Sequence, residues 1–298
     1  MADTLRQSYL DPAVLQRLEN MKLCARRLAE GVIAGLHRSP HHGGSVEFSE
    51  YIEYTPGHEV RHIDWTVFGK TDKFYVKKFE DETNLEAYAI VDASGSMGFQ
   101  GETAPFSKLE YAAYVSATLA YLLVRQGDAI GAMGFADTTG RFLPAAARTS
   151  HLDDVFYLLQ DLDAAGSTAL DESLQRIAKH ARRRSLVMIF SDFLDAGEQT
   201  AKLLRVLRSR RLDVALFHVL DEDELSLPYE GLTIFEGMED DGELLVEPDD
   251  IRLRYQQAIR AHCEELERTC KKADIGYLRT TTATPIEEVC QRFLRGRT

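Results

Sequence analysis

Five oxygen-bearing side chains, spread over three segments, have the types and spacing of a metal site. They are Asp92, Ser94, Ser96, Thr168 and Asp192. Two carboxylates and three hydroxyls, without an imidazole or a thiolate among them, suit a hard divalent cation such as Mg²⁺ or Mn²⁺, which also keeps some of its waters. The hydroxyls add no charge, so we expect the ion to favour one more anionic oxygen, such as an Asp or Glu of a protein partner.

Buried strands must position these residues. A strand predicted at 85–91 runs directly into the first segment, and a strand predicted at 186–190 runs into the third. The threonine follows Gly166-Ser167 and opens a predicted helix. Ligands bind beyond the carboxyl ends of the strands in an open parallel sheet, so the three segments should meet at one edge.

Residues 85–298 are predicted to form a doubly wound, mostly parallel, Rossmann-like α/β sheet. Apolar strand patterns alternate there with amphipathic helical patterns, which is typical of a sheet covered on both faces. An acidic turn between two strand-like pieces predicts an inserted β-hairpin at about 232–246. The other predicted strands are 129–135, 141–143, 214–219 and 275–279, and the predicted helices are 107–126, 151–161, 170–182, 199–210, 250–272 and 285–295.

Residues 1–84 are predicted to form a separate N-terminal region of helix and strand. Asp11 followed by Pro12 is an N-cap with proline at the first helical position, and apolar residues then recur at helical spacing. Two stretches with strand character follow, at 46–54 and 73–79.

Composition limits the class of protein and its partners. The chain has 298 residues, of which 44% are hydrophobic, as in a globular protein. Its 35 Lys and Arg against 48 Asp and Glu give a net charge of −13, which disfavours nucleic acid. The longest uncharged run, 111–124, is shorter than the roughly 20 residues that span a bilayer. We therefore expect no membrane span and a cytoplasmic protein, with its four cysteines as free thiols.

The pattern D-x-S-x-S, followed by a later Thr and a later Asp, resembles the metal-ion-dependent adhesion site (MIDAS) of von Willebrand factor A domains. The resemblance implies direct ligation of the ion by Ser94, Ser96 and Thr168. It implies that Asp92 and Asp192 act directly or through water. The alternative without a metal is that these residues cap helices and turns, as Ser and Asp often do.

Four motifs stand before the sheet. They are Gly44-Ser45-Val46-Glu47-Phe48, Tyr54-Thr55-Pro56-Gly57, Arg61-His62-Ile63-Asp64-Trp65 and Tyr75-Val76-Lys77-Lys78-Phe79-Glu80. Together they resemble a bacterial family of unknown function, whose members carry a von Willebrand A-like domain and tend to be encoded beside MoxR-type AAA+ ATPases. The resemblance implies a non-enzymatic, metal-dependent partner or adaptor of that ATPase, with a chaperone-like role in assembling or activating other proteins. The chain departs from the family at His58, where Asp is usual, and at Ile52, where Arg is usual.

A metal-dependent hydrolase is the alternative function, either at the same Mg²⁺ site or through zinc. His58-Glu59-Val60-Arg61-His62 satisfies H-E-x-x-H, the zinc peptidase motif, and Glu80 or Glu86 could be a third ligand. The motif requires a helix, whereas Pro56-Gly57 immediately precedes it. No residue set combines a nucleophile, a base and an orienting group, which favours an interaction module without catalysis.

Arg61, Asp64 and Trp65 leave two interpretations open. The Arg and the Asp could pair and fix a corner with the indole packed on the sheet domain. The same residues could instead contact a partner.

Overall fold

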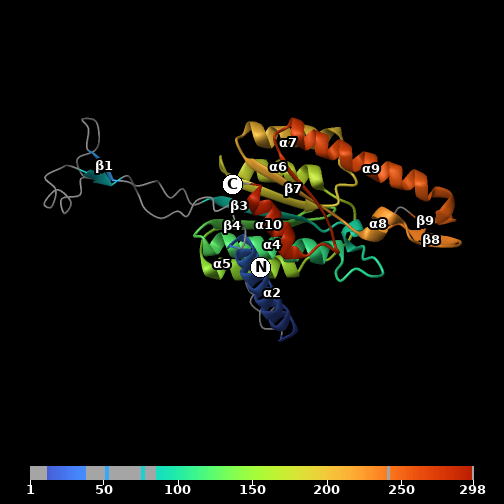
Figure 1. The fold of residues 1–298 in the computed structure, drawn as a ribbon, viewed down its shortest axis with the longest axis horizontal. Helices are drawn as coiled ribbons and strands as arrows, with labels where there is room; N and C mark the ends of the chain where they lie inside the picture. The colour runs from blue at the N-terminus through green and yellow to red at the C-terminus, as the bar shows by residue number, and fades with distance from the viewer. Residues whose placement is uncertain (1–11, 38–50, 54–74, 78–84, 240–241, 297–298) are drawn as a thin grey trace. The chain divides into compact units, whose positions relative to one another are not determined.

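The computed structural model describes residues 12–37, 51–53, 75–77, 85–239 and 242–296 (Figure 1). The chain divides into two compact units, one made of Met1–Arg38 with Leu85–Thr298 and the other of Ser39–Asn84. In the smaller unit, β1 (Tyr51–Glu53) pairs antiparallel with β2 (Tyr75–Lys77). The strands predicted at 46–54 and 73–79 are therefore confirmed over these residues.

A six-stranded sheet in the order β10-β7-β6-β3-β4-β5 forms the centre of the larger unit. All neighbouring pairs are parallel except β4 and β5, so β5 is an antiparallel edge strand. The four inner strands are buried almost throughout, because helices cover both faces of the sheet. The predicted doubly wound α/β fold is confirmed. The strands are β3 (Glu86–Asp92), β4 (Ala129–Phe135), β5 (Thr139–Ala146), β6 (Leu186–Ser191), β7 (Asp213–Leu220) and β10 (Gly276–Thr281).

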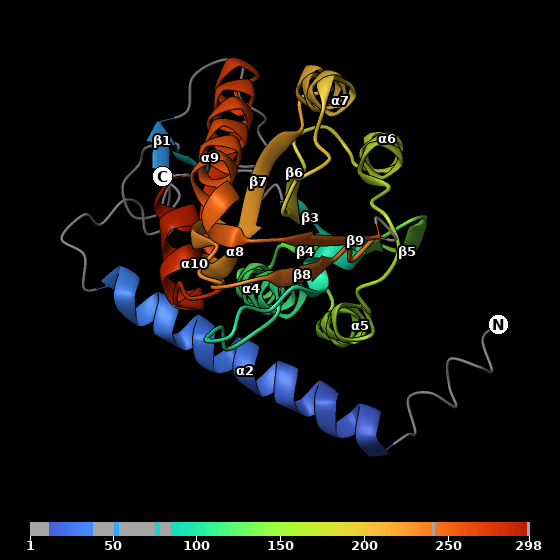
Figure 2. The same ribbon diagram turned by 90° about the vertical axis from the view of Figure 1, so that its right-hand side faces the viewer.

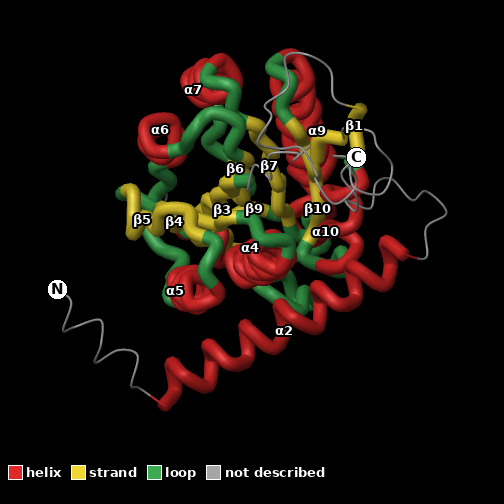
Figure 3. The backbone as a smooth tube through the Cα atoms, turned by 90° about the vertical axis from the view of Figure 1, so that its left-hand side faces the viewer, coloured by secondary structure: helices red, strands yellow, loops and turns green. Residues whose placement is uncertain are grey.

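Two hydrophobic cores lie on opposite faces of this sheet (Figure 3). Helices α4 (Lys108–Arg125), α5 (Thr149–Gln160) and α10 (Ile286–Arg295) contribute buried residues to one core. Helices α6 (Leu170–His180), α7 (Glu198–Ser209) and α9 (Pro248–Lys272) contribute to the other. All six helices agree with the predicted ones to within two residues at every end.

The N-terminal helix α2 (Pro12–His37) packs on α4, α5 and α10. Its buried residues Met21, Ala25, Ala29 and Val32 form one helical stripe, and the two alanines allow close approach. The helix therefore shares the core of the sheet domain. The predicted boundary at residue 84 coincides with the end of the smaller unit. The assignment of the helix to the N-terminal region differs from the structure, because the sequence pattern located the stripe but not the surface that covers it.

A separate hairpin, β8 (Thr233–Glu236) with β9 (Glu243–Val246), confirms the one predicted at 232–246. It lies across the carboxyl end of the central sheet (Figure 2). Two short helices near this edge were not predicted, η2 (Gly95–Gly98) and α8 (Glu222–Ser226).

The structure also bears on the predictions about membrane spans and about the cysteines. None of the helices in the described part of the chain has the length and apolar character needed to cross a membrane. The four cysteines are free, and all but the half-buried Cys24 are buried.

Candidate metal centre

Asp92 is the last residue of β3, a strand with neighbours on both sides, and its side chain is 1% exposed. The carboxylate accepts three hydrogen bonds. The amide of Ser94 donates to Oδ1 at 2.9 Å, while the hydroxyls of Ser191 and Thr168 donate to Oδ2 at 2.6 and 3.2 Å. In the part of the chain that the structure describes, no Lys, Arg or His donates to it.

Backbone hydrogen bonds hold the first two predicted segments together. Gly95 N–H donates to the carbonyl of Gly166 at 2.8 Å, and Ala165 N–H donates to the carbonyl of Ala93 at 3.0 Å. The hydroxyls of Ser94 and Ser96 lie 3.2 Å apart. The fold therefore brings four of the five predicted ligands, those on the first two segments, into one cluster of oxygens.

Asp192, the fifth predicted ligand, is buried beside this cluster but has other donors. Its Oδ2 accepts from Nζ of Lys108 at 2.8 Å, and its Oδ1 from the amide of Leu194 at 3.3 Å. The negative charge of Asp192 nevertheless acts on Asp92 and helps to raise its pKa. Asp192 is thus close enough to influence the site electrostatically while it pairs with a cation of the chain itself.

Lys108 is the main residue of the site that the sequence did not reveal. It begins α4, its side chain is 0% exposed, and its ammonium bridges Asp192 and Glu224, the latter at 2.5 Å. Burial opposes the charged form, but the two carboxylates outweigh it and raise the pKa of Lys108 above its usual value. The group therefore stays an ammonium and does not act as a base.

Burial raises the pKa of Asp92 to about 6, although hydrogen bonds from Ser191 and Ser94 oppose the shift. A carboxylate held in this way is ionised at neutral pH but poorly compensated. A bound cation would remove the deficit, which is the first indication that these residues fit an ion.

The donor set is the second indication. Among the described residues, no group of three or more His, Cys, Asp or Glu side chains is arranged to hold a metal. The candidate set instead combines the hydroxyls of Ser94, Ser96 and Thr168 with the carboxylates of the two aspartates. Such an all-oxygen set fits Mg²⁺ or Mn²⁺ and does not fit a zinc site built on Cys and His.

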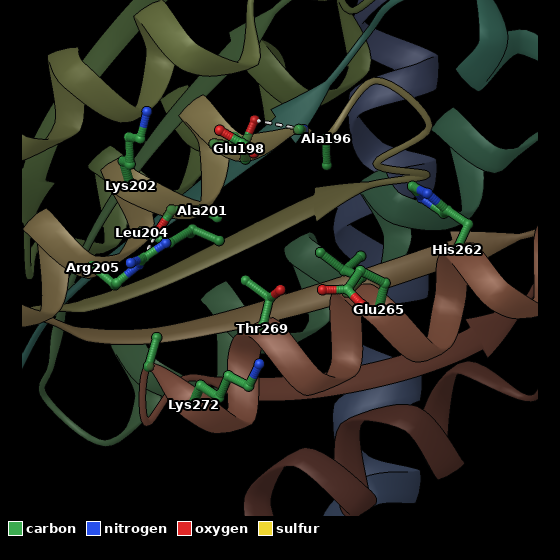
Figure 4. Close-up of a pocket in the computed structure, with 14 residues that line it drawn as sticks. Ala196, Glu198, Ala201, Lys202, Leu204, Arg205, His262, Glu265, Thr269 and Lys272 are labelled. Atoms are coloured by element: carbon green, nitrogen blue, oxygen red, sulfur yellow. Dashed lines mark hydrogen bonds between the residues drawn. The ribbon is translucent and has the colours of Figure 1, made fainter.

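A small cavity of about 250 Å³ opens beside Ser96, with Asp195, Glu224 and Glu239 among its lining residues. A larger hollow of about 700 Å³ lies between α7 and α9 (Figure 4). Its lining carries charges of both signs, including Lys202, Glu265 and Lys272, and none of the five predicted ligands. The smaller cavity is therefore the one that adjoins the candidate site.

The zinc alternative cannot be followed in the structure. The H-E-x-x-H segment at 58–62, Trp65 and Glu80 all lie outside the described residues. Of the possible third ligands only Glu86 is described, and its carboxylate accepts from Arg182 at 2.8 Å.

Comparison of the chain with known protein families identifies the family to which it belongs. Residues 50–265 match the family described as "Protein of unknown function DUF58". The chain belongs to this family. The membership confirms the part of the predicted resemblance that concerned a family of unknown function.

The relatives found by sequence are uncharacterized proteins, and the similar solved structures inform the fold alone. Two relatives are each 26% identical to this chain over 272 residues. They are "Uncharacterized protein Rv1480" of Mycobacterium tuberculosis and "Uncharacterized protein Mb1516" of Mycobacterium bovis. The matched residues cover 90% of this chain and 84% of theirs. The crystal structure of "conserved hypothetical protein BatB" from Bacteroides thetaiotaomicron matches 71% of this chain and 98% of its own, with a TM-score of 0.50 and 14% identity. The SpRpn10 VWA domain matches 70% and 94%, with a TM-score of 0.43 and 10% identity. The likeness to the BatB structure agrees with the predicted fold class, an α/β fold with a mostly parallel central sheet.

Proposed function

We propose that this protein is a non-enzymatic interaction module that binds a carboxylate of a protein partner through a divalent cation, Mg²⁺ or Mn²⁺. The observation that carries the proposal is the carboxylate of Asp92, which is buried, accepts hydrogen bonds from hydroxyl groups and has no cationic partner among the described residues. Asp92, Ser94, Ser96, Thr168 and Asp192 would hold the ion, and the ion would supply a Lewis acid that binds an anionic oxygen.

The charge balance supports an acidic partner group. Asp92 and Asp192 would supply two negative charges to the ion, while the ammonium of Lys108 pairs with Asp192 and with Glu224. Because Lys108 takes part of the Asp192 charge, the ion is neutralised less than two free aspartates would neutralise it. A carboxylate from outside is then a favourable ligand, although a net charge of −13 opposes acidic surfaces elsewhere.

The same groups support a role without catalysis. The hydroxyls of Ser94 and Ser96 face each other, and the buried amine nearest the site is the charged Lys108. Among the described residues of the cluster, a nucleophile with its base is therefore missing. We expect purified protein to show no ATPase, phosphatase or peptidase turnover, and turnover lost in Asp92→Ala would favour the hydrolase instead.

For the partner we propose a MoxR-type AAA+ ATPase or its client, on the strength of the family resemblance in the sequence. The test is a pull-down of that ATPase with the full chain, with EDTA and after Mg²⁺ is restored. Thr168→Ala removes one neutral ligand and should weaken capture. Thr269→Ala removes the same atoms from the distant α7–α9 hollow and should not. Capture that survives both chelation and Thr168→Ala would contradict the proposal.

A further inference from the structure

Met238 and Glu239, which follow β8 of the hairpin, lie directly on the loop that carries Ser94 and Ser96. A Cβ on Gly95 would come within 1.9 Å of the carbonyl oxygen of Met238, so only glycine permits this approach. The Met238 side chain reaches on to Gly98, where its Cε would lie 3.4 Å from an added Cβ. The hairpin tip and the metal-binding loop are thus in van der Waals contact.

The tip also brings a carboxylate to the site. The amide of Ser96 donates to Oε1 of Glu239 at 3.3 Å, and Glu239 is half-buried. Ser96, Glu224 and Glu239 line the same cavity of about 250 Å³. Glu239 therefore stands at the mouth of the site, where a carboxylate from another protein would have to enter.

The rest of the hairpin is held loosely by comparison. Within the described chain, β8 and β9 pair with each other and with no strand of the central sheet. Ile234 and Leu245 face each other across the hairpin, and each is 58% exposed. Apart from the ring contact of Phe235 with Tyr229, the hairpin is mostly exposed, and no residue of β8 or β9 belongs to either described core, so displacing the tip would leave both cores intact.

We infer that Glu239 would act as a ligand of the ion supplied by the chain itself, and that it must leave before a partner carboxylate can bind. The inference rests on the proposed function. A tethered carboxylate competes at an effective concentration in the millimolar range. A free acidic side chain alone would then compete poorly, and only a partner with further contacts would displace the tip.

The test is the affinity of the purified full chain for Mn²⁺, measured by electron paramagnetic resonance of the free ion. Glu239→Gln keeps the shape of the side chain and removes its charge, and it should weaken Mn²⁺ binding roughly tenfold, or about 1.4 kcal/mol. Glu243→Gln makes the same change at an exposed position of the same hairpin and should leave the affinity within about twofold of wild type.

A chemical rescue separates ligation from simple support of the loop. Glu239→Ala leaves room beside the cavity, so sodium acetate should tighten its Mn²⁺ binding relative to sodium chloride at equal ionic strength. Acetate should have no such effect on wild type, in which the position is filled. Equal affinities in acetate and chloride for Glu239→Ala would overturn the inference.

The two proposals fail differently. Wild type that binds no Mn²⁺ would overturn the proposed function together with the inference. Binding that is lost in Asp92→Ala but unchanged in Glu239→Gln would overturn the inference alone and leave the metal site standing.

Discussion

Strands β3 and β6 are neighbours, and each leads into a buried aspartate at the same edge of the sheet, yet the two carboxylates are compensated differently. Asp192, after β6, receives the ammonium of Lys108. Asp92, at the end of β3, accepts hydrogen bonds from two hydroxyls and one amide, and from no cationic group of the described chain. The carboxylate of Asp192 is paired with a cation of the chain, whereas that of Asp92 is compensated by neutral donors alone among the described residues.

The difference is one of free energy. The attraction between the ammonium and its two carboxylates offsets much of the free-energy cost of burying these charges. Hydrogen bonds from neutral donors offset the cost of burying a carboxylate only in part. The raised pKa of Asp92, about 6, reflects this deficit. We therefore expect the β6 end to contribute stability to the metal-free protein and the β3 end to cost stability.

The largest effect should follow from removing the ammonium. Lys108→Met leaves Asp192 and Glu224 buried without a partner, so it should lower the free energy of unfolding by about 3–5 kcal/mol. Urea denaturation at pH 7 measures the change. The triple variant Lys108→Met, Asp192→Asn, Glu224→Gln removes all three charges and should recover most of the loss. A single variant as stable as wild type would show that the ion pairs contribute nothing.

The opposite sign is expected at the other aspartate. Asp92→Asn should raise the free energy of unfolding of the metal-free protein at pH 7 by up to about 3 kcal/mol, because a pKa raised by roughly two units opposes ionisation in the folded state. A group whose folded pKa is raised stabilises below its unfolded pKa, near 4, and loses that contribution as the pH rises through 6. The gain from the substitution should therefore fade as the pH is lowered from 7 to 4.

Urea denaturation of wild type and Asp92→Asn at several pH values, with a chelator present, measures this difference. A gain that is independent of pH, or a loss at pH 7, would mean that the β3 end is compensated as well as the β6 end.

A smaller effect is expected where the hairpin touches the β3 loop. Gly95→Ala places a methyl group against the backbone of Met238, which should displace the tip and cost on the order of 1–2 kcal/mol. Gly276→Ala is the matched control, since its Cβ would meet only ordinary contacts at 3.5 Å or more. Limited proteolysis within the hairpin should accelerate in the first variant alone. Equal rates in both would place the tip away from the loop in solution.

The sequence predicted the β3 end better than the β6 end, for a physical reason. Asp92 ends the strand β3, whose residues 87–91 are apolar or aromatic, and Ser94 and Ser96 follow it. The alternation of strands with helices and the parallel-sheet rule together locate all three. Lys108 gives no such signal. It stands in the first turn of an amphipathic helix, after the capping serine Ser107, where a lysine is normally solvated.

The remaining misses have the same origin in tertiary packing. Asp221 and Glu224 form a capping box that could have revealed α8, but not that Glu224 pairs with a buried lysine. Glu239 lies in the acidic turn that, from the sequence, predicted only the hairpin itself. Its contact with Ser96 depends on how the hairpin folds back over the sheet, which neither local pattern contains.

The most direct test of the central claim is the effect of Mg²⁺ on stability, measured by thermal or urea unfolding of wild type and Asp92→Asn. If Asp92 is the carboxylate left for an ion, Mg²⁺ at about 100 times its dissociation constant should add roughly 2.7 kcal/mol to wild type and nothing to the variant. Unfolding of wild type that is unchanged across Mg²⁺ and Mn²⁺ titrations, or stabilised equally in the variant, would contradict the account.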